Sequence, residues 1–129
     1  MPGEFEDLDV YKQAREVRKR VWKLTRLLPR DQEWVLKSQM QRAALSLTNN
    51  IAEGHGSWSY RHNISYLRRS RGSCTELQDD LNACEDEAYF PKEHLDDLRV
   101  DIRSVIRLIN GYIAYLTKRA AKAGGKEDN

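Results

Sequence analysis

The stretch that decides the fold is LDDLRVDIRSVIRLINGYIAYL, residues 95–116. Its apolar side chains recur at alternating steps of three and four residues, at Leu95, Leu98, Ile102, Val105, Ile109, Tyr112 and Leu116. This spacing lines one face of an α-helix, whereas the side chains of a half-buried β-strand alternate every second residue. The sequence therefore predicts a long amphipathic helix that buries one face against other helices.

Three stretches upstream repeat this spacing and are separated by residues that break helices. Pro29, the glycines at 54 and 56, and Pro91 divide the chain into four pieces of about 20 to 30 residues. We expect buried faces at Ala14, Val17, Val21, Leu24 and Leu28, then at Leu36, Met40, Ala43, Leu47 and Ile51, and then at Ile64, Leu67, Ser70, Cys74, Leu77, Leu81 and Cys84 or Ala88.

The ends of these helices are predicted from residues that commonly cap helices. Asp9 is the expected N-cap of the first helix, the second restarts at Arg30 and Asp31, and Ser57 or Ser59 opens the third. Gly54 is expected to end the second helix in a left-handed conformation.

Four helices with short connections predict an all-α fold, a single antiparallel up-down-up-down four-helix bundle. A chain of 129 residues and 15.1 kDa has the length of one domain. We assign residues 1–120 to the bundle and residues 121–129 to a polar flexible tail.

Composition excludes several classes of protein. No apolar run approaches the ~18 to 20 residues of a membrane span, and the start, MPGEFEDLDV, lacks the basic and apolar segments of a secretory signal. Cys74 and Cys84 lie about 15 Å apart in one predicted helix, which is too far for a disulfide. We therefore expect a cytoplasmic protein with reduced thiols and no membrane contact.

Residues that commonly carry catalysis form no recognisable pattern. The three histidines, His55, His62 and His94, are scattered, and no HExxH, CxxC or GxxxxGK[ST] occurs. Both cysteines lie on an expected core stripe, where a nucleophile would lack its adjacent base. We expect no metal site, no cofactor and no enzymatic activity.

The strongest signal of function is a row of cations opposite the buried face of the first helix. Six cations fall within an arc of about 80° with no acid among them: Lys12, Arg15, Lys19, Lys23, Arg26 and Arg30. Trp22 lies beside this row, between Arg18 and Arg26. Such an arrangement suits base stacking or cation–π packing. With three arginines of the third helix, the candidate nucleic-acid site comprises Lys12, Arg15, Arg18, Lys19, Trp22, Lys23, Arg26, Arg30, Arg61, Arg68 and Arg69.

Three interpretations of this basic face remain open. It binds the backbone of a nucleic acid, with a steep dependence on salt. Alternatively, it meets the acidic end of a neighbouring subunit in a ring, which makes the protein an interaction scaffold. It is otherwise a solvated surface. The acidic end is expected where the third and fourth helices connect, at Glu76, Asp79, Asp80, Asp86, Glu87, Glu93, Asp96, Asp97 and Asp101.

The fourth helix carries more apolar residues than one bundle interface needs. Ile106, Leu108, Ile113 and Tyr115 lie outside its main stripe. We predict that they form a subunit interface, which Gly72 and Gly111 would allow to pack closely. The alternative is a wide core within one chain.

Residues 39–54, QMQRAALSLTNNIAEG, resemble the signature of the four-helix-bundle family named for 23S rRNA intervening-sequence proteins. The flanks agree with this resemblance: FEDL at 5–8 followed by VY at 10–11, LP at 28–29, GS at 72–73 and EL at 76–77. Trp34 departs from the tyrosine that is usual in the family. Asn49 departs from its usual small residue.

The resemblance implies a homo-oligomer, specifically a pentamer, with no established enzymatic activity and a possible association with RNA. The motif residues Arg42, Asn49, Asn50, Glu53 and Gly54 recur at helical spacing near the end of the second helix. We interpret them as structural, and a ligand-contact role remains the alternative.

Overall fold

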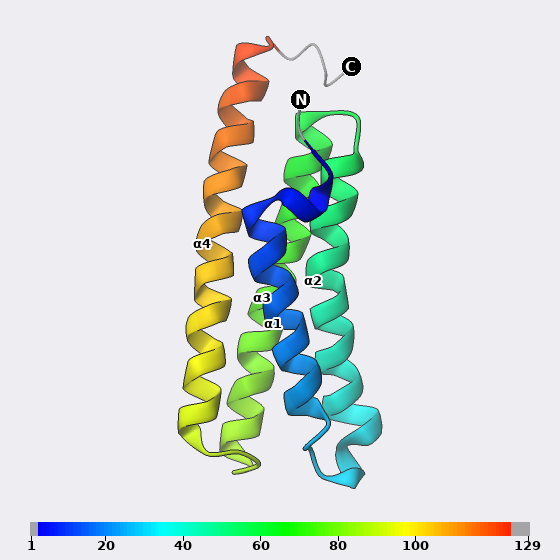
Figure 1. Ribbon diagram of the computed structural model, residues 1–129, viewed down its shortest axis with the longest axis vertical. Coiled ribbons are helices and arrows are strands. Elements are labelled where there is room, and N and C mark those ends of the chain that lie inside the picture. Colours follow the sequence, from blue (N-terminus) through cyan, green and yellow to red (C-terminus); the bar gives the residue numbers. More distant parts are fainter. Residues whose placement is uncertain (1–2, 125–129) are drawn as a thin grey trace.

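The computed structural model describes residues 3–124, in which all regular secondary structure is helical. Four long helices form the body: α1 (Asp9–Thr25), α2 (Ser38–Gly56), α3 (Tyr60–Asp86) and α4 (Lys92–Lys122). Short turns precede α1 (η1, Phe5–Asp7) and α2 (η2, Arg30–Gln32, and η3, Glu33–Lys37). Consecutive helices run in opposite directions (Figure 1). The predicted all-α four-helix bundle is confirmed.

The helices follow chain order around the bundle, because α1 and α3 each pack against α2 and α4. The stripe of α4 lies in the core as predicted, with Leu95, Leu98, Ile102, Val105 and Ile109 at most 2% exposed. Within residues 3–124, no helix has both the length and the apolar character to cross a membrane.

The third helix begins at one of the two predicted caps. Ser59 is the N-cap of α3, and its Oγ accepts a hydrogen bond from the His62 N–H at 3.1 Å. The predicted cap of the first helix was wrong, since Asp9 is the first residue of α1 and Leu8 occupies the cap position. Asp9 still places a carboxylate in the first turn, where the helix dipole favours it.

The second helix starts later than predicted. The chain makes the 3₁₀ turn η2 and the π-helical turn η3 before α2 begins at Ser38. Leu36 of η3 is 7% exposed and belongs to the core, whereas Trp34 and Val35 are 88% and 61% exposed. A π turn holds more residues than an α turn. The irregular turn η3 therefore leaves the indole of Trp34 outside the bundle.

The end of the chain differs slightly from the prediction. Helix α4 continues through Lys122, so the first two residues of the predicted tail are helical. Residues 125–129 of that tail lie outside the described residues.

Gly54 does not end α2, which corrects its predicted role as a C-terminal cap. Helix α2 continues to Gly56, and the extended Ser57 follows it. A Cβ at Gly54 would lie 2.6 Å from Asn63 Oδ1 and 3.2 Å from the Asn63 carbonyl oxygen. Close approach of α2 and α3 therefore requires glycine at this buried position. By contrast, a Cβ at Gly72 or Gly111 would have no described neighbour within 4 Å.

Asp80 was expected on the outer face of the third helix, but it is buried, with 2% exposure. Gln39 of α2 donates a hydrogen bond to Asp80 Oδ1 at 2.6 Å, and Oδ2 has no partner among the described residues. Burial raises the pKa of Asp80 to about 6. The Gln39 hydrogen bond opposes this shift, and the negative charges of Glu76 and Asp79 add to it.

Gly54→Ala should lower the free energy of unfolding by about 1 to 3 kcal/mol, because the new methyl group overpacks the α2–α3 contact. Gly72→Ala is the matched control. It adds the same methyl group in open space within a helix and should stabilise the protein by up to about 1 kcal/mol. Urea denaturation of both variants measures these changes. Equal effects of the two substitutions would contradict the close approach at Gly54.

Asp80→Asn should stabilise the protein more at alkaline than at acidic pH. The unfolded chain releases the Asp80 proton near its ordinary pKa of 3.8, whereas the folded chain holds it until about 6. The stability contributed by the protonated carboxyl is fully present below 3.8 and is lost as the pH rises through 6. The asparagine keeps an acceptor for Gln39 and carries no charge.

Urea denaturation at about pH 4 and about pH 8 tests this expectation. The gain in free energy of unfolding over the wild-type protein should be larger at the higher pH. A gain that is independent of pH would show that the Asp80 carboxyl keeps its ordinary pKa in the fold.

Candidate nucleic-acid interface

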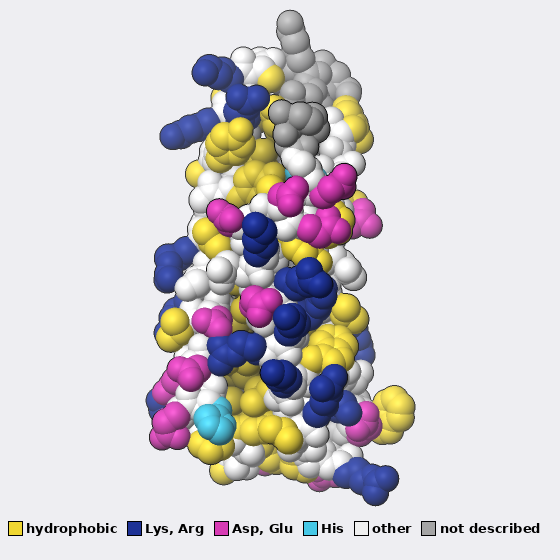
Figure 2. Space-filling model, viewed as in Figure 1, with side chains coloured by type: hydrophobic (Ala, Val, Ile, Leu, Met, Phe, Trp, Pro, Cys, Tyr) yellow, Lys and Arg dark blue, Asp and Glu magenta, His cyan; other side chains and the backbone are white. Residues whose placement is uncertain are grey.

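The cations of α1 form an outward-facing row, as the sequence predicted. Lys12, Arg15, Lys19, Lys23 and Arg26 are exposed, and Arg18 is half-buried at the edge of the row. Figure 2 shows Lys and Arg side chains gathered along the front of the molecule, where α1 lies in Figure 1. Arg26 is the C-cap of α1 and keeps a helical conformation, so it continues the row. Arg30 does not belong to this helical face, because it follows Pro29 and begins η2.

Carboxylates of the same chain neutralise little of this row. Lys19 pairs with Glu16 at 3.3 Å, but both side chains are about 60% exposed, so the pair adds little stability. Arg18 donates to Thr48 Oγ1 of α2 at 2.8 Å, which is not an ion pair. The remaining cations make no ion pair with residues 3–124: Lys12, Arg15, Lys23, Arg26 and Arg30.

A groove of about 510 Å³ lies where this row meets α2. It is lined by Arg18, Lys19, Trp22, Lys23, Arg26 and Leu45. Trp22 is half-buried and packs against the core, and Leu45 of α2 is 43% exposed. The groove therefore combines an apolar surface with four cations.

A second groove of about 330 Å³ adjoins the first and shares Trp22 and Leu45 with it. Its other lining residues are Glu33, Trp34, Ser38, Gln41 and Arg42. We call the two together the α1–α2 groove. Sequence reasoning missed Trp34 and Leu45 as candidate site residues. A signal was present, since both are large apolar residues outside the stripe defined by Leu36, Met40 and Leu47.

The three arginines of α3 do not join the α1–α2 groove. Arg61, Arg68 and Arg69 are exposed, but α2 and α4 separate α3 from α1, and α3 lies behind α1 in Figure 1. The Arg69 guanidinium lies 4.9 Å from the centre of the Tyr66 ring. The predicted nucleic-acid site is therefore divided between two faces of the bundle.

The motif residues of α2 also point in several directions. Arg42 donates to Ser38 Oγ at 3.1 Å, and Asn50 Nδ2 donates to the Ser46 carbonyl at 2.9 Å. Asn49 and Glu53 line a different groove of about 710 Å³ with Trp58, His62 and Tyr66. Arg42 and Glu53 make no ion pair with each other or with another described residue.

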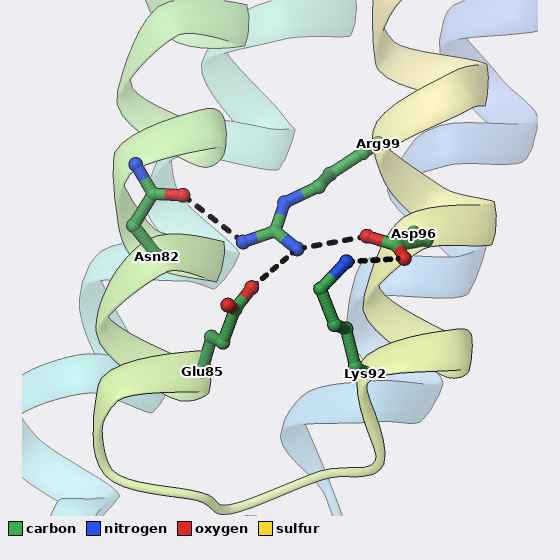
Figure 3. Close-up of polar contacts among 5 residues, drawn as sticks. All are labelled: Asn82, Glu85, Lys92, Asp96 and Arg99. Carbon is green, nitrogen blue, oxygen red and sulfur yellow. Dashed lines mark hydrogen bonds and ion pairs between the residues drawn. The ribbon is translucent and has the colours of Figure 1, made fainter.

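The acidic end of the bundle is engaged only in part within its own chain. Arg99 Nη1 contacts Glu85 at 2.7 Å and Asp96 at 3.0 Å, and Lys92 contacts Asp96 at 2.9 Å (Figure 3). The hydrogen bond from Lys92 and then that from Arg99 lower the pKa of Asp96. Asp101 pairs with Arg20 of α1. The other carboxylates of this end are exposed and make no ion pair with residues 3–124: Glu76, Asp79, Asp86, Glu87, Glu93 and Asp97.

The predicted interface residues of α4 lie on two sides of the helix. Ile106 and Ile113 are half-buried and pack against the core of their own chain. Leu108 and Tyr115 are 37% and 53% exposed and lie two turns apart on the other side. The exposed part of the predicted interface is therefore limited to Leu108 and Tyr115.

Cys74 and Cys84 are buried free thiols, as predicted. Burial raises the pKa of Cys74 to about 12. Burial, with a further contribution from the Asp80 charge, raises the pKa of Cys84 to about 11. Both thiols are therefore protonated near neutral pH, whereas nucleophilic cysteines are thiolates.

These features define an all-α bundle that carries an exposed cationic groove between its first two helices. Residues 3–124 contain no group of three or more His, Cys, Asp or Glu side chains arranged to hold a metal ion. The chain belongs to the 23S rRNA-intervening sequence protein family, whose sequence profile matches residues 6–111. The resemblance found in residues 39–54 and their flanks is thereby confirmed.

A crystal structure of a protein of unknown function from Bacteroides thetaiotaomicron, a member of the S23 ribosomal protein family, has a similar fold. The TM-score is 0.75 at 22% sequence identity, and the match covers 81% of this chain and 97% of that chain. At this identity the similarity establishes the fold alone. A comparison with curated proteins gives no match.

Proposed function

We propose that this protein is a non-enzymatic, cytoplasmic helical bundle that binds nucleic acid through the basic face of α1. The observation that carries the proposal is the group of exposed α1 cations that have no carboxylate partner within residues 3–124: Lys12, Arg15, Lys23 and Arg26. The two buried free thiols suit a reducing cytoplasm.

The energetic reason is mutual repulsion among these cations. Cations one helical turn apart lie about 6 Å from each other, and like charges at that spacing destabilise the helix. A phosphate backbone removes this repulsion and releases its own condensed counterions on binding. The affinity should therefore fall steeply with salt, by about 0.9 log unit per log unit of salt for each phosphate contacted on a duplex.

The family name gives a reason to begin with RNA. It refers to sequences that intervene in 23S rRNA, and association with such RNA is proposed here for this chain by that analogy. The charge row itself does not distinguish RNA from DNA, because both present the same phosphate backbone.

Replacing Lys19, Lys23 and Arg26 together by glutamate should abolish binding to a structured RNA at about 50 mM salt. A mobility-shift titration at about 50 and about 200 mM salt measures both the affinity and its salt dependence. Arg61, Arg68 and Arg69 of α3, which are exposed on another face of the bundle, provide the matched control, because their replacement by glutamate changes the net charge equally. If both triple variants lose the same affinity for the RNA, binding depends on net charge and not on the α1 face.

Self-association is a second candidate function, and we propose it from the exposed apolar residues of α4. Val100, Leu108 and Tyr115 are 51%, 37% and 53% exposed, and Gly111 lies among them with open space at its Cβ position. A second copy that covers Leu108 and Tyr115 would remove this apolar surface from water. The pentamer implied by the resemblance is the expected state.

Replacing both Leu108 and Tyr115 by glutamate should dissociate the oligomer, because two carboxylates would be buried without partners. Light scattering after size exclusion should give a multiple of 15.1 kDa for the wild-type protein and the mass of one chain for the variant. Leu27→Glu serves as the control, because Leu27 is 73% exposed and lies outside α4.

A monomeric wild-type protein at micromolar concentration would contradict the interface. The charge-reversed α1 variant should keep its mass. If it dissociates instead, the basic row serves assembly and not nucleic-acid binding.

A further inference from the structure

The α1–α2 groove contains two indole rings as well as cations. Trp22 lines both halves of the groove, and Trp34 lines the half that extends toward Arg42. Trp34 is 88% exposed, although burial of an aromatic side chain normally contributes to stability. Among the described residues, neither ring stacks on an aromatic side chain or lies beneath a cation. A ligand can therefore reach Trp34 and the exposed part of the half-buried Trp22.

The charges of the groove favour an anionic ligand. Arg18, Lys19, Lys23 and Arg26 lie along α1, and Arg42 lies on the α2 side. Glu33 is the one carboxylate among the lining residues, and Lys37 already pairs with it at 3.2 Å. A ligand that carries negative charge along its length and flat apolar groups beside that charge matches this pattern.

We propose that the α1–α2 groove binds single-stranded nucleic acid, with unpaired bases on Trp22 and Trp34 and phosphates on the cations of α1. This inference rests on the nucleic-acid binding proposed above and adds the form of strand that is recognised. Every base has a π face, so stacking on indoles binds single strands with little dependence on sequence.

A duplex would use the same site poorly. Its base faces are covered by neighbouring base pairs, so only the phosphates would find partners and the indoles would meet the sugar–phosphate backbone. An unpaired strand can place its bases on the rings while its phosphates keep their contacts with α1. The tryptophans therefore separate single-stranded from double-stranded ligands, whereas the cations attract both.

Trp34→Ala tests this assignment, because Trp34 is so exposed that its removal leaves the core intact. The probes are labelled oligo(U) and oligo(dT) of about 20 nucleotides, each alone and annealed to its complement. The variant should bind the single strands about tenfold more weakly than the wild-type protein, as loss of one stacked base predicts. Its affinity for the duplexes and the salt dependence of binding should be unchanged.

Trp58→Ala is the matched control. Trp58 is 65% exposed and lies in the connection between α2 and α3, outside the α1–α2 groove. The Trp58→Ala variant should bind single strands and duplexes as the wild-type protein does. Because the chain has three tryptophans, Trp58→Phe leaves Trp22 and Trp34 as the sources of indole fluorescence, and single strands should quench it.

The outcomes distinguish this inference from the broader proposal. If the α1 charge reversal abolishes binding but Trp34→Ala binds single strands normally, nucleic-acid binding stands and base stacking is overturned. Duplexes bound as tightly as single strands would also overturn the strand preference. If the wild-type protein binds neither form at low salt, both proposals fail. Polyglutamate that binds as tightly as oligo(U), and equally loses affinity in Trp34→Ala, would assign the groove to an acidic polypeptide.

Discussion

The orientation of α1 about its own axis is the constraint on which the exposed charge of the bundle depends. Ala14, Val17 and Val21 are at most 1% exposed, so this face of α1 is held in the core. Arg18 bonds to Thr48 of α2 on one side, and Arg20 pairs with Asp101 of α4 on the other. The buried face and these two contacts together fix the rotation of α1 about its axis. The remaining cations of α1 therefore face solvent.

The same constraint explains why the groove contains both aromatic and charged groups. Trp22 is one residue from Val21, so its ring lies at the margin of the core and only part of it can be buried. Leu45 occupies the corresponding margin of α2, beside the buried Ala44. Where two amphipathic helices pack, such marginal residues meet at the surface and the cations lie just outside them. This half of the α1–α2 groove thus follows from how the helices pack, whereas the other half also needs the η3 turn, which supplies Glu33 and Trp34.

Periodicity predicted the fold well because a buried face is a property of one helix at a time. The stripe from Leu95 to Ile109 and the outward direction of Lys19 and Lys23 follow from 3.6 residues per turn. Features that depend on a second helix were predicted less well. The role of Gly54 is decided by the approach of Asn63, and the buried Asp80 finds its hydrogen-bond donor, Gln39, on another helix.

Flanking positions were ambiguous for the same reason. Ile106 and Leu108 both lie beside the α4 stripe, but neighbouring helices cover the first and leave the second exposed. Arg30 was grouped with the α1 row because its sequence position continues the helical spacing, but the chain turns after Thr25 and Arg30 begins η2. The groove could not be predicted from one helix, since Trp22 of α1 and Trp34 of η3 line the same groove only in the folded bundle.

The two core cysteines have a practical consequence for anyone who wants to follow this bundle in solution. Maleimide and iodoacetamide react with thiolates, and Cys74 and Cys84 are both inaccessible and protonated at the pH used for labelling. A single cysteine introduced on the surface would therefore take up a dye or spin label without prior removal of the native thiols. The native cysteines would therefore contribute no background signal to distance measurements with such labels.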